Sequence, residues 1–258
     1  MADIVRITPL KAFSDNYIWV LHDDRAAIVV DPGDAAPVLQ FLAQAHLALQ
    51  AIWITHHHHD HIGGLPALRA QWPDCPVYGP AGVSGVSEPV MEGSRPAALG
   101  LDCQVYEVPG HTSNHLAFHC GQHLFCGDTL FAAGCGRVFD GSIESLFASL
   151  QRLAALPPQT LCYPAHEYTL ANLQFALTLE PDNPALQQRW QRDRTRREHG
   201  LPTLPCLLAD ELRHNPFLRC GESGIRRAAH QHQPDSGDNA PSVFATLRQW
   251  KNDFRPPE

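Results

Sequence analysis

A run of histidines directly after an apolar stretch constrains this chain more than any other feature. Residues 55–64 read THHHHDHIGG, and they follow the apolar residues 51–54. A purification tag would lie at a terminus, whereas this run lies well inside the chain and ends at two glycines. A short apolar stretch followed by such residues predicts a buried strand with the histidines at its mouth.

The spacing within the run is that of metal ligands. Alternate side chains at the end of a strand point the same way, so His56 and His58 can bind one metal ion. Asp60 and His61 are adjacent and can turn toward a second ion nearby. Imidazole and carboxylate groups together suit zinc, iron or manganese. The run therefore predicts two divalent metal ions, Zn first, with Fe or Mn as alternatives.

Further ligands are expected where other strands end. Two metal ions bound in this way need roughly seven ligands, so three more are required. Three residues follow predicted strands: His111, Asp128 and His166. Taken alone, each of them is more often a packed or surface residue than a ligand. Beside the histidine run they become candidate ligands, and the two oxygens of Asp128 could bridge both ions.

Strand and helix signals alternate in the first part of the chain and give way to helices in the second. We expect an α/β domain over residues 1–165 and a small α-helical domain over 166–258, in which the polar residues 220–241 form a loop. Apolar runs predict strands at 27–30, 51–55, 105–108, 115–119, 123–126 and 160–162. Apolar spacing predicts helices at 38–45, 65–72, 143–153 after Ser142, 170–177, 184–199 after Asn183, and from Phe244.

The net charge and its distribution along the chain limit the kinds of ligand that we expect it to bind. The formal net charge of −8 argues against nonspecific binding to nucleic acid. The negative charge lies in residues 1–165, where it suits the binding of cations. Residues 166–258 are neutral overall, with 12 Lys and Arg against 12 Asp and Glu, so basic side chains there are available for an anionic ligand.

Composition predicts a cytoplasmic protein, and we expect it to be a monomer. The apolar fraction of 44% is ordinary for a soluble protein, and no run of apolar residues is long enough to span a membrane. The first residues, MADIVRITPLKAF, lack the pattern of a signal peptide. The eight cysteines form no C-x-x-C pair, so we expect them to be reduced and structural.

Short motifs along the chain carry a resemblance to a known family. H-x-H-x-D-H is followed by GHT, GDTLF and AHEY, in the order found in the metallo-β-lactamase superfamily. Nearly the whole chain resembles the glyoxalase II, or hydroxyacylglutathione hydrolase, family. That closer resemblance rests on DNYIW at 15–19, VVDPGD at 29–34, GCGR at 134–137, NPFLR at 215–219 and Arg-x-x-Lys at 248–251.

The resemblance implies a fold and a ligand set. The fold is an αββα metallo-β-lactamase sandwich followed by a small α-helical domain. His57 and His59 fall on variable positions and are expected to bind no metal. Asp31 either orients a ligand histidine or only forms a turn. The implied ligands are His56, His58 and His111 for the first ion, Asp60, His61 and His166 for the second, and Asp128 as a bridge.

The resemblance also implies a reaction. The substrate is the thioester S-D-lactoylglutathione, which is hydrolysed to D-lactate and glutathione, the second step of methylglyoxal detoxification. A hydroxide that bridges the metals would attack the thioester carbonyl, and Asp60 would orient it. No serine or cysteine nucleophile is required.

Residues for glutathione recognition follow from the same resemblance. Arg248 and Lys251 lie three apart on the last predicted helix and would meet the glycine carboxylate, although an exposed pair of this kind is more often a solvated helix face. Tyr168 would add a hydroxyl contact. The family commonly has Lys and Tyr where this chain has Arg137 and Phe139, so these two contacts change in geometry and in hydrogen bonding.

Three alternatives compete with this interpretation. A persulfide dioxygenase with one iron would use part of the ligand set, but the complete set and the Arg-x-x-Lys pair argue against it. A superfamily nuclease is disfavoured by the net charge of −8. A non-catalytic metal-binding protein would have closed metal sites and would unfold when the metal is removed.

Overall fold

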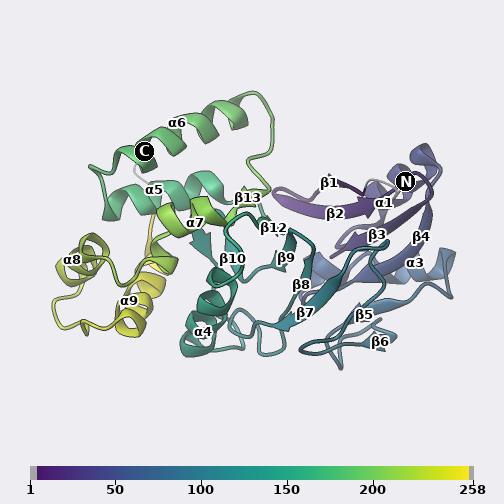
Figure 1. The fold of residues 1–258 in the computed structure, drawn as a ribbon, viewed down its shortest axis with the longest axis horizontal. Helices are drawn as coiled ribbons and strands as arrows, with labels where there is room; N and C mark the ends of the chain where they lie inside the picture. Colours follow the sequence, from purple (N-terminus) through teal and green to yellow (C-terminus); the bar gives the residue numbers. More distant parts are fainter. Residues whose placement is uncertain (1–4, 256–258) are drawn as a thin grey trace. The chain divides into compact units, whose positions relative to one another are not determined.

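The computed structural model describes residues 5–255, which form two compact units (Figure 1). Unit 1 comprises the residues up to Val108 together with Asn114–Gly127. Unit 2 comprises Pro109–Ser113 and the residues from Asp128 onward. Each unit is described below by itself.

A six-stranded sheet organises unit 1. Its strand order is β1-β2-β3-β4-β5-β6, with antiparallel pairing among β1, β2 and β3 and parallel pairing from β3 to β6. Its strands are β1 (Arg6–Ala12), β2 (Asn16–His22), β3 (Ala26–Val30), β4 (Ala48–Trp53), β5 (Val77–Gly79) and β6 (Glu88–Pro89). Its helices are α1 (Ala35–Ala45), α2 (His59–Ile62) and α3 (Leu65–Gln71).

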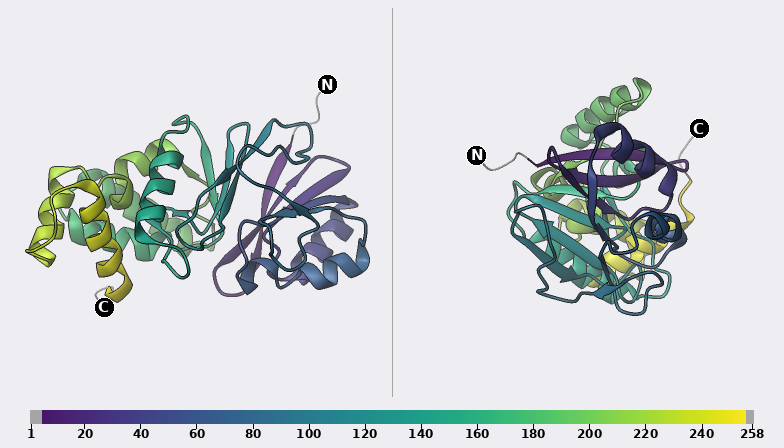
Figure 2. Two further views of the ribbon diagram at one scale, coloured as in Figure 1. Left: turned by 90° about the horizontal axis from the view of Figure 1, so that it is seen from below. Right: turned by 90° about the vertical axis from the view of Figure 1, so that its right-hand side faces the viewer.

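One face of this sheet is covered by helices. Val29 and Ile52 point to the same side of β3 and β4, and they pack with Val38 and Leu42 of α1 and Leu68 of α3 in one buried core. Figure 2 shows α1 and α3 along this side of the sheet. The strands β3 and β4 are apolar on both faces, which is typical of parallel strands that are covered on both sides.

The other face of the sheet packs against a second sheet. In unit 1 the strands β7 (Cys103–Glu107), β8 (Leu116–Cys120) and β9 (His123–Gly127) form an antiparallel meander. The ring of Trp53 on β4 stacks on Phe118 of β8 with 4.9 Å between the ring centroids. Helices, sheet and sheet therefore follow one another as layers within unit 1, and β4 ends beside the meander.

The expectation that all cysteines are reduced is wrong for two of the eight. Cys103 and Cys120 lie directly opposite each other in the pairing of β7 with β8 and form a disulfide. The pairing could not be predicted from sequence, because the two cysteines are 17 residues apart and only the register of the meander brings their side chains together. The other six cysteines are free thiols, and five of those are buried.

Unit 2 is mainly helical. Helix α4 packs on α9, where the rings of Phe147 and Phe244 lie 5.3 Å apart. Short strand pairs join β10 to β11 and β12 to β13. The strands are β10 (Leu130–Phe131), β11 (Gly134–Cys135), β12 (Leu161–Pro164) and β13 (Cys206–Leu207). The helices are α4 (Ile143–Ala154), α5 (Thr169–Leu179), α6 (Pro184–Glu198), α7 (Leu208–His214), the 3-10 helix η1 (Pro216–Leu218), α8 (Ser223–His232) and α9 (Ala240–Asp253).

The predicted helix starts are confirmed at two positions. Ser142 accepts a hydrogen bond from the backbone N–H of Ser145 at the start of α4. Asn183 caps α6 in the same way, with Pro184 as the first helical residue.

The prediction of a loop over 220–241 is wrong, because it contains α8 and the start of α9. Helix α8 is polar except for Ile225, Ala228 and Ala229, whose spacing places them on one buried face. One isoleucine and two alanines among charged and polar neighbours are a weak signal in sequence, and their burial by the rest of unit 2 stabilises the helix. Helix α9 begins at Ala240, four residues before the predicted start, with Asn239 as its N-cap.

None of the helices within residues 5–255 combines the length and the apolar composition that crossing a membrane requires.

Candidate metal centre

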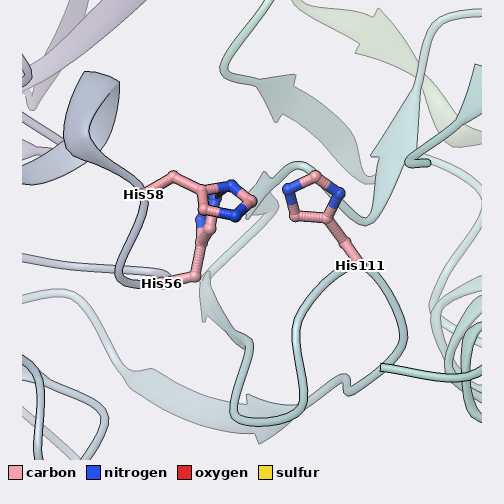
Figure 3. A group of neighbouring side chains, drawn as sticks. All are labelled: His56, His58 and His111. Atoms are coloured by element: carbon pink, nitrogen blue, oxygen red, sulfur yellow. Dashed lines mark hydrogen bonds between the residues drawn. The ribbon is translucent and has the colours of Figure 1, made fainter. Parts of the chain in front are cut away.

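The histidine run begins in the loop after β4 and continues into α2, which starts at His59. His56 is fully buried, whereas the next side chain, His57, is exposed. The Nε2 atom of His56 lies 3.0 Å from Nδ1 of His58, so these two imidazoles face each other (Figure 3). His59 is also exposed. The alternation expected from strand geometry is therefore present at the first three positions of the run.

Asp31 orients His61 from the end of β3. Its Oδ2 atom lies 3.1 Å from Nδ1 of His61. The carboxylate also accepts hydrogen bonds from the backbone N–H and the hydroxyl of Thr55, at 2.8 and 2.7 Å. Because Nδ1 of His61 faces Asp31, Nε2 is the atom that could bind a metal ion. Of the two interpretations of Asp31, the contact supports the orienting one.

Two further residues of unit 1 support the run and were not predicted as part of the site. The amide of Asn16, at the start of β2, donates a hydrogen bond of 3.0 Å to Oδ2 of Asp60. The buried ring of His115 stacks on His56 with 4.6 Å between centroids. Gly127 leaves space for this stack, since a Cβ there would lie 2.8 Å from His115. Asn16 could have been found from sequence because it belongs to the DNYIW motif, whereas His115 is a lone histidine in no such motif.

Unit 2 brings three of the predicted ligands together. Oδ2 of Asp128 lies 3.4 Å from Nε2 of His111 and 3.3 Å from Nε2 of His166. All three side chains are buried. Nδ1 of His111 lies 2.6 Å from the carbonyl oxygen of Arg137, which fixes the ring with Nε2 toward Asp128. These distances place the Asp128 carboxylate next to both imidazoles, where it could serve as a ligand together with either of them.

Aromatic rings stand beside two of these ligands. Tyr168 stacks on His166 with 4.8 Å between centroids, and Phe139 meets His111 edge-on at 5.2 Å. Both rings are exposed, as is Arg137. The three candidates for glutathione recognition at 137, 139 and 168 therefore lie next to His111 and His166 and are accessible.

Arg248 differs from the other candidates because it is buried. Its Nη1 atom donates to the carbonyl oxygens of Cys135 and Gly136, at 2.9 and 3.2 Å, and Nη2 donates to Asn252. The guanidinium carbon lies 5.3 Å from the centroid of the Phe217 ring. Arg248 therefore holds the backbone of the two residues directly before Arg137, and its side chain does not lie on a solvated helix face.

Lys251 lies one turn further along α9. Its Nζ atom donates to the carbonyl oxygen of Ala171 at 3.1 Å and lies within 5.5 Å of the rings of Phe175 and Phe254. Burial, followed by the charge of Arg248, lowers the pKa of Lys251 to about 8. This ammonium group is consequently one that an anionic ligand would stabilise.

Histidine and aspartate side chains form groups that could hold metal ions. Within each group the candidate ligand atoms lie within 4.8 Å of one another. The seven residues in these groups are the seven predicted ligands, and the donor set of imidazole and carboxylate fits zinc, iron or manganese. The groups are His56 with His58 and His111 (Figure 3), His56 with His61 and Asp128, and Asp60 with His61 and His166.

Similarity to known proteins agrees with the motifs. Residues 13–100 and 104–166 match the metallo-beta-lactamase superfamily, and residues 167–254 match the family described as hydroxyacylglutathione hydrolase C-terminus. A hydroxyacylglutathione hydrolase from Nitrosomonas eutropha is 47% identical over 256 residues, covering 98% of this chain and 100% of that protein. The chain belongs to the hydroxyacylglutathione hydrolase family. A further member, from Xylella fastidiosa, is 49% identical over 253 residues, with 97% and 98% coverage.

Solved structures confirm the expected fold class. ETHE1 from Myxococcus xanthus is 26% identical, with a TM-score of 0.64 and coverage of 96% of this chain and 97% of that chain. TTHA1623, solved in a di-iron-bound form, is 26% identical, with a TM-score of 0.56 and coverage of 83% and 100%. This member of the hydroxyacylglutathione hydrolase family therefore has the α/β fold of the metallo-β-lactamase superfamily followed by a helical C-terminal region.

Proposed function

We propose that this enzyme hydrolyses S-D-lactoylglutathione to D-lactate and glutathione, the second step of methylglyoxal detoxification. The observation that carries the proposal is the combination of seven clustered His and Asp residues that could hold metal ions with a C-terminal region of the hydroxyacylglutathione hydrolase type. Relatives of nearly the same length that are about half identical bear that enzyme's name.

Two divalent ions would complete the site. We assign His56, His58 and His111 to the first ion and Asp60, His61 and His166 to the second, with Asp128 bridging. Zinc suits this donor set, with iron or manganese as alternatives, and the di-iron form of TTHA1623 supports the count of two. When bound, such ions make hydroxide available near neutral pH and polarise a carbonyl oxygen.

The protein's own residues would orient the reactants. Asn16 holds one oxygen of Asp60 by its hydrogen bond, so the carboxylate keeps a fixed direction and can orient the attacking hydroxide. Asp31 and the carbonyl oxygen of Arg137 fix the rings of His61 and His111. These contacts keep the site preorganised for attack on the thioester carbonyl.

Residues 166–258 would form the domain that recognises glutathione. Tyr168 and Phe139 offer exposed rings, Arg137 an exposed guanidinium, and Lys251 a charge for the glycine carboxylate. Arg248 would serve recognition by holding the backbone that carries Arg137, in addition to placing positive charge beside Lys251.

The test is metal analysis paired with a thioester assay. The expected result is close to two metal ions per chain and release of free thiol from S-D-lactoylglutathione, with activity lost on chelation while the fold is retained. Unfolding on chelation without any hydrolysis would indicate a non-catalytic metal protein instead. Oxygen consumption with a glutathione persulfide would favour the dioxygenase alternative. The cytoplasmic location and the monomeric state stay predictions, and gel filtration would test the second.

A further inference from the structure

Phe13 combines two features that stability alone does not favour. It lies in the turn between β1 and β2 with φ of +50°, a left-handed conformation that a bulky side chain rarely adopts. Phe13 is 57% exposed. Strained backbone at a residue that buries little apolar surface costs free energy and is found preferentially at functional sites. Phe13 therefore calls for a role outside the core.

The ring of Phe13 stands beside the metal-ligand loop. A Cβ added at Gly33 would lie 2.9 Å from Cε2 of Phe13 and 1.8 Å from the backbone oxygen of Asp60. Glycine is therefore the only residue type at position 33 that lets the Phe13 ring and the Asp60 backbone approach from two sides. The same turn leads into Asn16, which holds the Asp60 carboxylate. The turn thus presents an exposed aromatic ring next to a predicted ligand.

We propose that Phe13 contacts the acyl group of the thioester substrate and sets the preference among acyl groups. The inference rests on the proposed function, in which the residues for the glutathione half of the substrate all belong to unit 2. The acyl half then has to be met from other residues. Among the described residues of unit 1, the exposed large apolar side chains are Phe13 and Met91, and only Phe13 lies beside a candidate ligand.

An aromatic contact predicts a definite selectivity. A phenyl group on the α-carbon of the acyl group can pack against the Phe13 ring, whereas the methyl group of lactate offers much less surface. A contact between two aromatic rings is worth about a three- to tenfold change in binding beyond the simple burial of area. Phe13 is accordingly a specificity residue that leaves the reacting carbonyl to the metal site.

The experiment compares S-D-lactoylglutathione with S-D-mandeloylglutathione, which differ only by methyl and phenyl. In Phe13→Gly, which suits the left-handed backbone, kcat/KM for the mandeloyl thioester should fall about three- to tenfold more than that for the lactoyl thioester. Phe13→Tyr should restore the ratio. Met91→Ala, a change at an exposed apolar residue away from the ligands, should leave it unchanged. Inhibition by free glutathione should be the same in all four proteins.

Two outcomes separate this inference from the proposed function. Equal changes for both thioesters in Phe13→Gly, or no change in either, would overturn the role of Phe13 while hydrolysis itself stands. Absence of hydrolysis of any glutathione thioester by the metal-loaded wild-type protein would overturn the proposed function first. Thermal unfolding of Phe13→Gly provides the check on folding, and a midpoint close to that of the wild type is expected.

Discussion

The Oδ2 atom of Asp31 lies 3.1 Å from Nδ1 of His61, and both side chains are buried. Asp31 lies directly after β3, and His61 lies in α2, the short helix that follows the neighbouring parallel strand β4. Asp31 adopts φ of +52° and is held by Thr55, so its carboxylate cannot easily turn away. This carboxylate therefore leaves Nε2 of His61 as the nitrogen that could bind a metal ion.

The first prediction concerns this contact. Asp31→Asn keeps a residue that tolerates the left-handed conformation but removes the negative charge, so the affinity for the second metal ion should fall about 10- to 100-fold. Metal titration of the apoprotein measures it. Asp34→Asn is the matched control, because Asp34 only caps α1 and asparagine caps equally well. Equal metal affinity in both variants would mean that Asp31 merely forms the turn.

The second prediction tests the register of the histidine run. His58→Ala should lose bound metal, because His58 faces His56, whereas His57→Ala should keep metal near the wild-type content, because His57 is exposed. Metal analysis after dialysis against buffer distinguishes the two variants. Severe loss of metal from His57→Ala would show that the register is wrong.

The third prediction concerns the bridging carboxylate. Asp128→Ala should reduce bound metal below one ion per chain and abolish thioester hydrolysis, because Asp128 lies within 3.4 Å of the Nε2 atoms of both His111 and His166. Asp182→Ala, at an exposed acidic residue, is the control for the lost charge. Two bound ions and normal hydrolysis in Asp128→Ala would exclude the bridging assignment.

The fourth prediction concerns Arg248. Arg248→Ala removes hydrogen bonds to two buried carbonyl oxygens, each worth roughly 1.5–3 kcal/mol when the donor is charged, so the thermal midpoint should fall. KM for S-D-lactoylglutathione should rise more than kcat falls, with metal content unchanged. Arg227→Ala, on the surface of α8, should alter neither quantity. An unchanged KM in Arg248→Ala would remove Arg248 from substrate recognition.

The fifth prediction is a pH dependence. Since burial lowers the pKa of Lys251 to about 8, the ammonium group loses its charge as pH rises through that value, and kcat/KM for the anionic thioester should decline. Lys251→Arg stays charged and should show a flatter profile above pH 8. In the unfolded chain the lysine keeps its proton up to its ordinary pKa of 10.5, so the contribution of Lys251 to stability should rise with pH between these values. Identical pH profiles of kcat/KM for the wild type and Lys251→Arg would contradict the role of the Lys251 charge in substrate binding.

The clustering of the candidate ligands could be predicted from sequence because metal chemistry tightly restricts which residues can bind such ions. Few residue types bind such ions, and His56, His58, Asp60 and His61 lie so close in the chain that local geometry brings them together. Strand signals before each distant candidate then placed those residues at strand ends. The helix starts at Ser142 and Asn183 were predictable for the same reason, because a cap acts on backbone groups two or three residues away.

Only the tertiary structure decided the features that depend on distant partners. Asn16 holds Asp60 across 44 positions of sequence, and Arg248 is buried against a carbonyl oxygen 113 positions away. The Cys103–Cys120 disulfide depends on the register of two strands, and α8 depends on the burial of Ile225, Ala228 and Ala229. No local pattern encodes such contacts, because their free energy comes from groups that meet only once the chain has folded. The sequence by itself determined the ligand chemistry, while the fold determined which side chains orient, bury and surround it.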